Sequence, residues 1–249
     1  MPRLSGWWKR STGWRRGTGA FWAGCGGSNG DWSLEIESRI VIFANGELHQ
    51  PDLLKRHFRP GDRIFCADGG TRHALALGLK PERIIGDLDS LPETLVQNLR
   101  AQGVIIERHP RRKDQTDLEL AFRRAAAEDP AEIMLATALG GRLDQMLANI
   151  LLLTAPEYAG IRLTLVDGNQ WAAILRPGVP LVVRGHPGDT LSVVPLTPTV
   201  TGVTLRGVEW PLDRAVLSLG STWTISNEMT APEAQVSLED GLALVVVIQ

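Results

Sequence analysis

From residue 40 onward, apolar runs alternate along the chain with stretches of helical periodicity. Residues 40–44 read IVIFA, a continuous apolar run that is typical of a strand buried on both faces of a sheet. Residues 117–128 place their apolar side chains on one face, as an amphipathic helix does. The same patterns predict further strands at 63–67, 83–85, 104–107, 132–137 and 161–167, further helices at 71–77, 92–102 and 143–154, and a helical stretch that begins at Pro51 and includes Phe58.

The alternation of strands with helices predicts a mainly parallel sheet with helices on both faces. The pattern changes after about residue 170, where glycine and proline turns separate short strand candidates and no convincing helix occurs. These candidates are 181–184, 190–194, 203–206, 215–217, 235–238 and 242–248. We therefore expect an α/β domain at residues 39–169, followed by a small all-β sandwich domain at residues 170–249.

Residues 1–38 differ from the rest of the chain. They contain five of the eight tryptophans and many glycines, without helical or strand periodicity. We expect a disordered extension, or a start site assigned too early. Arg15-Arg16 and the later Trp22-Ala23-Gly24-Cys25 resemble an export signal that ends in a lipid-modified cysteine. The stretch between them is too short and too rich in glycine for a signal-peptide core, so export is not the favoured interpretation.

The composition argues against several classes of protein. The formal net charge of −2 gives no bulk positive field to hold nucleic acid. No apolar run approaches the roughly 20 residues that a helix needs to span a bilayer. Cys25 and Cys66 form neither a disulfide framework nor a zinc motif, and they suit a reducing cytoplasm.

Polar motifs follow the strands of the predicted parallel sheet. Ligands of open α/β sheets bind beyond the carboxyl ends of the strands, so these motifs are expected to converge on one edge. They are Asn45-Gly46, Asp68-Gly69-Gly70, Gly86-Asp87-Leu88-Asp89-Ser90, Lys113-Asp114-Gln115-Thr116-Asp117 and Gly140-Gly141-Arg142-Leu143-Asp144.

Carboxylates dominate these motifs and indicate a metal site. Six aspartates would share one cleft: Asp68, Asp87, Asp89, Asp114, Asp117 and Asp144. Clustered carboxylates repel one another unless a cation lies between them, and Mg2+ with phosphate oxygens is the usual case. The glycines allow close backbone approach, and Lys113 and Arg142 supply positive charge for a polyphosphate. The set predicts a metal-nucleotide site for phosphoryl-type transfer, with Asp87, Asp89 and Asp117 as metal ligands.

Each motif also has a purely structural interpretation. Asp-Gly-Gly is a common turn, and Thr116 can cap the following helix, with Glu119 completing a capping box. Arg142 and Asp144 can form a surface ion pair at a helix start. Asp87 and Asp89 are harder to explain this way, because an acidic pair between glycine and serine suits neither a core nor a plain loop. No P-loop, G-x-G-x-x-G, protein-kinase or G-x-S-x-G signature occurs in the sequence.

In their order and spacing these motifs, together with Asn149, resemble the thiamine pyrophosphokinase family. The resemblance extends into the all-β segment, where residues 207–212 (GVEWPL) resemble the family's tryptophan-containing turn and Ser226-Asn227-Glu228 its Ser-Asn signature. It covers roughly residues 40–248. Two positions depart from the family: Gln145 stands where histidine is frequent, and Met229 where an aromatic residue or leucine is frequent. Because glutamine does not titrate, we expect no proton transfer at position 145.

The resemblance implies an enzyme that uses Mg2+ and transfers the diphosphate of ATP to the hydroxyl of thiamine, leaving AMP. It implies a homodimer whose site is completed by the partner's β domain. The residues that it assigns to catalysis are Asp87, Asp89, Asp117 and Arg142. Those assigned to ATP are Asn45, Asp68, Gly69, Gly70, Gly86, Lys113, Asp114, Thr116, Gly141 and Asp144, and those assigned to thiamine are Trp210, Ser226, Asn227 and Glu228.

Alternatives remain open for both the tryptophan and the reaction. Trp210 could be a core or edge aromatic, and Trp223 lies nearer the Ser-Asn pair in sequence. A hydroxymethylpterin diphosphokinase would share the acidic edge, although the β domain with Trp210 argues against it. A non-catalytic nucleotide-binding regulator would have no need of Asp87, Asp89 and Asp117.

Overall fold

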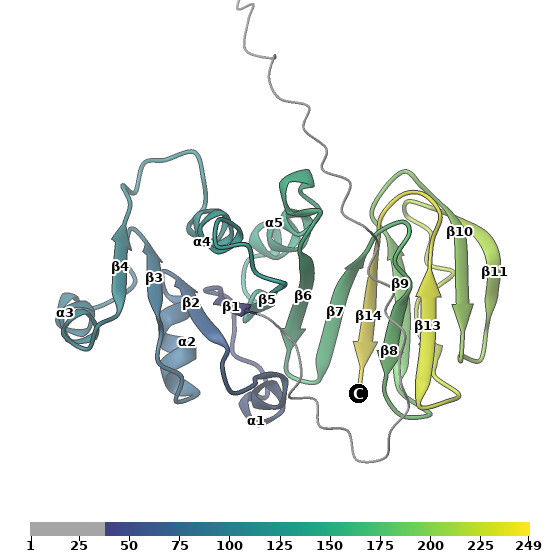
Figure 1. Cartoon of the computed structure of the whole chain (residues 1–249), viewed down its shortest axis with the longest axis horizontal. Coiled ribbons are helices and arrows are strands. Elements are labelled where there is room, and N and C mark those ends of the chain that lie inside the picture. The colour runs from purple at the N-terminus through teal and green to yellow at the C-terminus, as the bar shows by residue number, and fades with distance from the viewer. Residues whose placement is uncertain (1–37) are drawn as a thin grey trace, which may run out of the picture. The chain divides into compact units, whose positions relative to one another are not determined.

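The computed structural model describes residues 38–249, whose centre is a sheet of ten strands (Figure 1). Six of these strands are parallel: β1 (Arg39–Phe43), β2 (Arg63–Ala67), β3 (Arg83–Gly86), β4 (Ile105–Arg108), β5 (Glu132–Ala136) and β6 (Arg162–Asp167). They lie in the order β6-β5-β1-β2-β3-β4, so their carboxyl ends share one edge. The predictions for residues 1–37 lie outside the described residues.

Helices cover both faces of the parallel part. They are α1 (Pro51–Leu54), α2 (Gly70–Ala76), α3 (Glu93–Ala101), α4 (Asp117–Ala126) and α5 (Leu143–Leu152), with short 3-10 helices at Lys55–His57 and Pro156–Tyr158. In β1, Val41 and Phe43 pack with α1, α2 and α3, whereas Ile40 and Ile42 pack with α4. Both sets are fully buried, which explains the continuous apolar run in this strand.

The remaining chain continues the sheet and adds a second one. Strands β7 (Gln170–Leu175), β14 (Ala243–Ile248), β9 (Thr190–Pro195) and β12 (Asn227–Glu228) extend the sheet beyond β6 by antiparallel pairing. Strands β11 (Leu212–Ser218), β10 (Thr199–Arg206), β13 (Glu233–Ser237) and β8 (Leu181–Arg184) form a separate antiparallel sheet. Apolar residues of the two sheets form a common core, so this part is a β sandwich (Figure 1).

The predicted fold class is confirmed, with corrections to single elements. The helical stretch from Pro51 ends at His57, and Phe58 is already extended, with φ −87° and ψ 151°. Strands β7 and β12 were not predicted from the sequence. The division at residue 169 stays a prediction, because the ten-stranded sheet runs through that point. Among residues 38–249, no helix combines the length and hydropathy needed to cross a membrane.

Candidate active site

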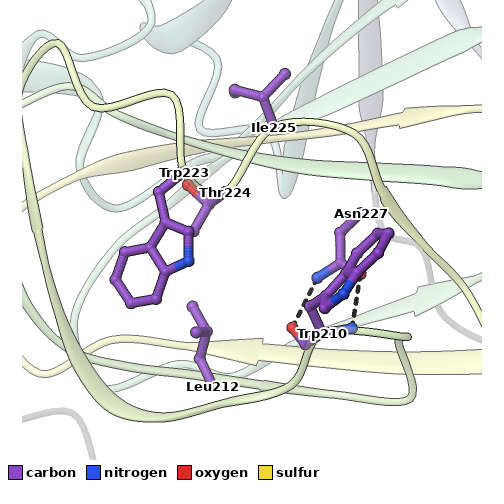
Figure 2. A pocket seen from close by; sticks show the side chains of 6 residues that line it. All are labelled: Trp210, Leu212, Trp223, Thr224, Ile225 and Asn227. Carbon is purple, nitrogen blue, oxygen red and sulfur yellow. Dashed lines mark hydrogen bonds between the residues drawn. The ribbon is translucent and has the colours of Figure 1, made fainter.

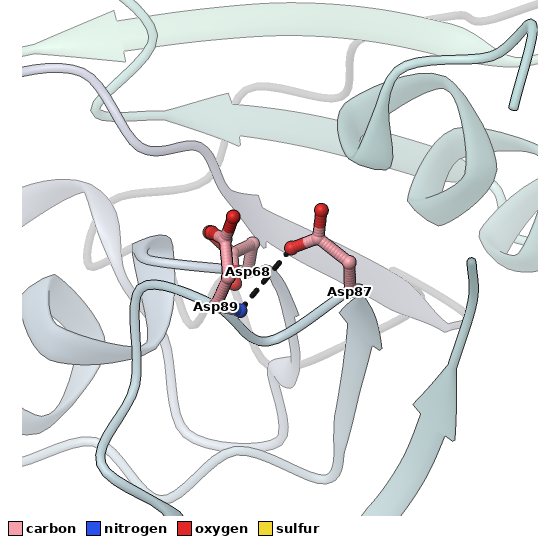
Figure 3. Close-up of side chains that lie close together, drawn as sticks. All are labelled: Asp68, Asp87 and Asp89. Atoms are coloured by element: carbon pink, nitrogen blue, oxygen red, sulfur yellow. Dashed lines mark hydrogen bonds between the residues drawn. The ribbon is translucent and has the colours of Figure 1, made fainter. Parts of the chain in front are cut away.

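Three aspartates meet at the carboxyl ends of β2 and β3. Asp68 directly follows β2, and Asp87 and Asp89 follow β3. One carboxylate oxygen from each lies within 4.8 Å of the others (Figure 3). The backbone amide of Asp89 donates to Oδ1 of Asp87 at 3.2 Å, which fixes the turn between them. The predicted convergence of these two loops is thus present in the structure.

Asp68 shows most directly that this cluster suits a cation. Its side chain is buried, and no hydrogen-bond donor among residues 38–249 reaches its Oδ1 atom. A buried, unpaired carboxylate oxygen beside two other carboxylates is unfavourable without a positive charge. Three carboxylates in neighbouring loops match the oxygen ligands that hard divalent ions prefer. The residues therefore fit a divalent metal ion.

Asp117 lies beside the cluster at the start of α4. Its Oδ1 atom is 2.8 Å from Nζ of Lys113, which lies four residues earlier in the loop before the helix. Burial raises the pKa of Asp117, Lys113 lowers it, and the nearby charges of Asp87 and Asp68 raise it further. A Cβ added at Gly86 would lie 3.0 Å from both Asp117 Cγ and Asp68 Cβ, so Gly86 allows these carboxylates to approach. The role of Asp117 as a metal ligand stays a prediction. Asp68, in contrast, lies in the same carboxylate cluster as Asp87 and Asp89.

The glycines after β2 are closely packed against the end of β1 and the residues that follow it. A Cβ at Gly70 would lie 2.2 Å from the carbonyl oxygen of Phe43, and one at Gly69 would lie 2.3 Å from Oδ1 of Asn45. These contacts bring the loops after β1 and β2 together. His73 Nε2 lies 3.0 Å from the carbonyl oxygen of Gly46 and ties the same loops. Gly70 thus has a structural role, because its neighbour is strand backbone, whereas Gly69 packs against a side chain.

Two other predicted positions also have evident structural roles. Thr116 is the N-cap of α4, and its Oγ1 accepts a hydrogen bond from the backbone amide of Glu119 at 3.1 Å. The Glu119 side chain instead pairs with Arg123, so the capping box is only half formed. Asp114 is exposed in the loop before the helix. The position of Thr116 therefore follows from helix capping alone.

Arg142 and Asp144 pair with each other at the start of α5. Arg142 Nε donates to Asp144 Oδ1 at 3.0 Å, and both side chains are exposed. This hydrogen bond lowers the pKa of the Asp144 carboxyl. Within the described chain, neither residue makes an ion pair or hydrogen bond with the clustered aspartates. The geometry agrees with a surface ion pair, and their roles toward ATP stay predictions.

A second site is a pocket of about 270 Å³ in the β sandwich (Figure 2). It is lined by Trp210, Leu212, Trp223, Thr224, Ile225 and Asn227. The indoles of Trp210 and Trp223 lie on opposite sides of it and are 61% and 62% exposed. Trp210 is therefore not a core aromatic. Trp210 and Trp223, which were alternative candidates for the thiamine site, therefore line the same pocket.

Asn227 positions one wall of this pocket. It is buried, its Oδ1 accepts from the backbone amide of Trp210 at 3.1 Å, and its Nδ2 donates to the Trp210 carbonyl at 2.8 Å. Ser226 and Glu228 lie outside the lining: the amide of Ser226 binds Ser192 Oγ, and Glu228 is exposed in β12. Leu212, Thr224 and Ile225 were missed, since nothing in their residue types distinguishes them from ordinary strand residues.

Comparisons with known families match both parts of the chain. The family described as "Thiamin pyrophosphokinase, catalytic domain" matches residues 54–165, and "Thiamin pyrophosphokinase, vitamin B1 binding domain" matches residues 181–243. A protein of Bacillus subtilis named thiamine pyrophosphokinase is 30% identical over 179 residues, covering 72% of this chain and 84% of its own length.

Solved structures give the same result. The structure of thiamine pyrophosphokinase from Bacillus subtilis superposes with a TM-score of 0.76 at 28% identity, covering 85% of this chain and 99% of its own. Thiamin pyrophosphokinase from Geobacillus thermodenitrificans has a TM-score of 0.72 at 29% identity, covering 85% of this chain and 97% of its own.

Proposed function

This chain belongs to the thiamine pyrophosphokinase family, and from that premise we propose which of its residues carry out the family's reaction. The chain is an enzyme that transfers the diphosphate of ATP to the hydroxyl of thiamine, giving thiamine diphosphate and AMP. The match of residues 181–243 to a vitamin B1 binding domain gives no support to a pterin substrate. The observation that carries the site assignment is the cluster of Asp68, Asp87 and Asp89, with its unpaired buried oxygen.

These three aspartates would hold Mg2+, with Asp117 at the edge of the cluster. When bound, the ion neutralises charge on the polyphosphate. Lys113 lies beside the cluster in its ion pair with Asp117, from which its ammonium group can also attract phosphate oxygens. Together these groups would hold the β-phosphate of ATP at the carboxyl edge of the parallel sheet.

The pocket between Trp210 and Trp223 would bind thiamine. A flat pyrimidine and a cationic thiazolium suit aromatic walls, which attract cations through the ring face. The hydroxyl oxygen of thiamine would attack the β-phosphorus and release its proton, and the bond from that phosphorus to the oxygen of AMP would break. Alignment of the two substrates and charge neutralisation would then provide most of the acceleration.

We further propose that the enzyme acts as a homodimer in which the partner's β sandwich completes each site. One support is α5, where Leu143, Leu147 and Leu151 follow one another at helical spacing and are 76%, 55% and 45% exposed. Such a row of exposed leucines is typical of a surface that another chain covers. A second support is the open pocket, whose two tryptophans remain more than half exposed.

We propose a cytoplasmic location, because the buried free thiol of Cys66 suits a reducing compartment.

The purified protein tests this function directly. It should convert thiamine and ATP into thiamine diphosphate and AMP in the presence of Mg2+, with chromatography to identify both products. Chelation by EDTA should stop the reaction, and excess Mg2+ should restore it. Formation of ADP in place of AMP, or preference for a hydroxymethylpterin as acceptor, would contradict the proposal.

A further inference from the structure

A second group of charged side chains lies at the same edge of the sheet. His49, in the loop after β1, lies between two carboxylates: its Nδ1 is 3.0 Å from Oδ2 of Asp167, and its Nε2 is 3.1 Å from Oε2 of Glu47. Asp167 ends β6 and is only 4% exposed, whereas Glu47 faces solvent. Imidazole donates from both nitrogens only when it is protonated. The geometry therefore favours the imidazolium form of His49.

The electrostatics agree with this geometry. The hydrogen bond and charge of Asp167 raise the pKa of His49, and Glu47 adds to the shift. Burial raises the pKa of Asp167, and the hydrogen bond from His49 opposes that shift. Burial of the imidazole opposes these contributions by lowering the pKa of His49. Protonated His49 thus neutralises the charge of the buried Asp167 carboxylate, and it also binds the exposed carboxylate of Glu47.

Glu47 connects this group to the loop that precedes α5. Its backbone amide donates to the carbonyl of Leu139 at 2.8 Å. Its side chain packs on Gly140, where an added Cβ would lie 2.7 Å from Glu47 Cβ and 2.8 Å from its Cγ and Cδ. The φ angles of Gly140 and Gly141 are +80° and +73°, a backbone conformation that glycine adopts readily. The packing of the Glu47 side chain against Gly140 restricts the position of this loop.

Other contacts already join the β1–α1 region to the turn after β6. Gln50 Oε1 accepts from the amide of Asn169 at 3.1 Å, and His57 Nε2 lies 3.3 Å from the carbonyl oxygen of Gly168. Because these contacts do not involve His49, the connection between the two segments does not depend on it. What His49 adds is control over the position of Glu47.

We propose that His49 is a positioning residue for ATP binding, which as an imidazolium holds Glu47 against Gly140 and so fixes the loop that leads into α5. This inference rests on the proposed function and on the expectation that Gly141, in this loop, contributes to the ATP site. Loss of the proton, or of the imidazole, should loosen this loop and weaken ATP binding while the fold persists.

The test is the dissociation constant of ATP with Mg2+, measured by calorimetry without thiamine from about pH 6 to pH 9. His49→Gln keeps a hydrogen-bonding side chain but neither bridges two carboxylates nor titrates. Below the raised pKa of His49, the variant should bind ATP about threefold to fivefold more weakly than the wild type, the range for one partly exposed ion pair. The ratio should approach one at high pH, where the wild type has lost the same charge. Ionisation of ATP affects both proteins and cancels in this ratio.

Two further variants separate positioning from simple stability. His57→Gln removes a contact with the same turn without touching Glu47, so its ATP affinity should stay at the wild-type value at every pH. Glu47→Gln should lose affinity like His49→Gln, and the double variant should lose no more than either single one. A ratio of one at all pH values, or a loss that does not change with pH, would overturn the role of His49. Failure of the wild type to bind ATP would instead overturn the proposed function, and this proposal with it.

Discussion

Asn227 holds the backbone of Trp210 at both its amide and its carbonyl, although 17 residues separate them. The amide group of Asn227 is therefore largely occupied by the protein, and its contribution to the pocket is to fix the indole wall. Because Asn227 is buried, its replacement by alanine would leave the hydrogen bonds of Trp210 without a partner. We therefore propose that Asn227 acts on thiamine through the position of Trp210.

Trp210→Ala should weaken thiamine binding about tenfold, because stacking on one aromatic face is worth ~1–2 kcal/mol. ATP binding should change little. Both indoles line the pocket. Calorimetric titration of Trp210→Ala, Trp223→Ala and the parent protein with thiamine therefore measures how much each tryptophan contributes to the affinity. An unchanged affinity in Trp210→Ala beside a loss in Trp223→Ala would identify Trp223 as the principal wall.

Asp68→Asn should abolish the response of the protein to Mg2+, and Asp87→Asn or Asp89→Asn should nearly abolish turnover. A ligand that binds only the folded state at 100 times its dissociation constant adds about 2.7 kcal/mol to its stability. Mg2+ should therefore raise the melting temperature of the wild type by several degrees and leave that of Asp68→Asn unchanged. Asp129→Asn is the matched control, because Asp129 is exposed at the other end of α4 and its φ of 50° suits asparagine. Equal shifts in all variants would show that the ion binds elsewhere.

Gly70→Ala should lower the stability of the whole fold, and this effect should be measurable in the absence of any ligand. The added Cβ would lie 2.2 Å from the carbonyl oxygen of Phe43, which belongs to the backbone of a central strand and cannot move aside. Overpacking of this kind typically costs about 1–3 kcal/mol, and sometimes more. Gly160→Ala is the control, since a Cβ there meets nothing within 4 Å. A normal melting temperature for Gly70→Ala would mean that Gly70 lies further from the end of β1 than the structure has it.

Leu147→Lys should convert the proposed dimer into a monomer and reduce activity with it. Leu147 is the middle residue of the exposed row on α5, so a charge there would not disturb the core of a monomer. Light scattering after size-exclusion chromatography measures the change. Val179→Lys, at a position that is 67% exposed in the turn before β8, should leave the oligomeric state as it is. A dimer that persists in Leu147→Lys would place the interface on another surface.

The sequence by itself determined the class of the fold and the edge on which the acidic loops meet. The apolar run of β1 shows burial on both faces because each residue of a strand alternates sides, a property that is local to the strand. Given parallel strands, Asp68 and Asp87 must follow strand ends on the same edge. Strand β7 was missed although Gln170–Leu175 is mostly apolar, because its place depends on pairing with both β6 and the distant β14.

Only the tertiary structure decided which residues touch. It shows that Asp68 clusters with Asp87 and Asp89. It also shows ion pairs between Asp117 and Lys113 and between Arg142 and Asp144. It also shows that Trp210 and Trp223 line one pocket, although the sequence had suggested them as alternative thiamine-binding residues. Such contacts depend on the distance and direction of side chains from different strands and loops. Local periodicity fixes the element on which a residue lies, but distances of a few ångström between elements arise only when the whole sheet and its loops are packed.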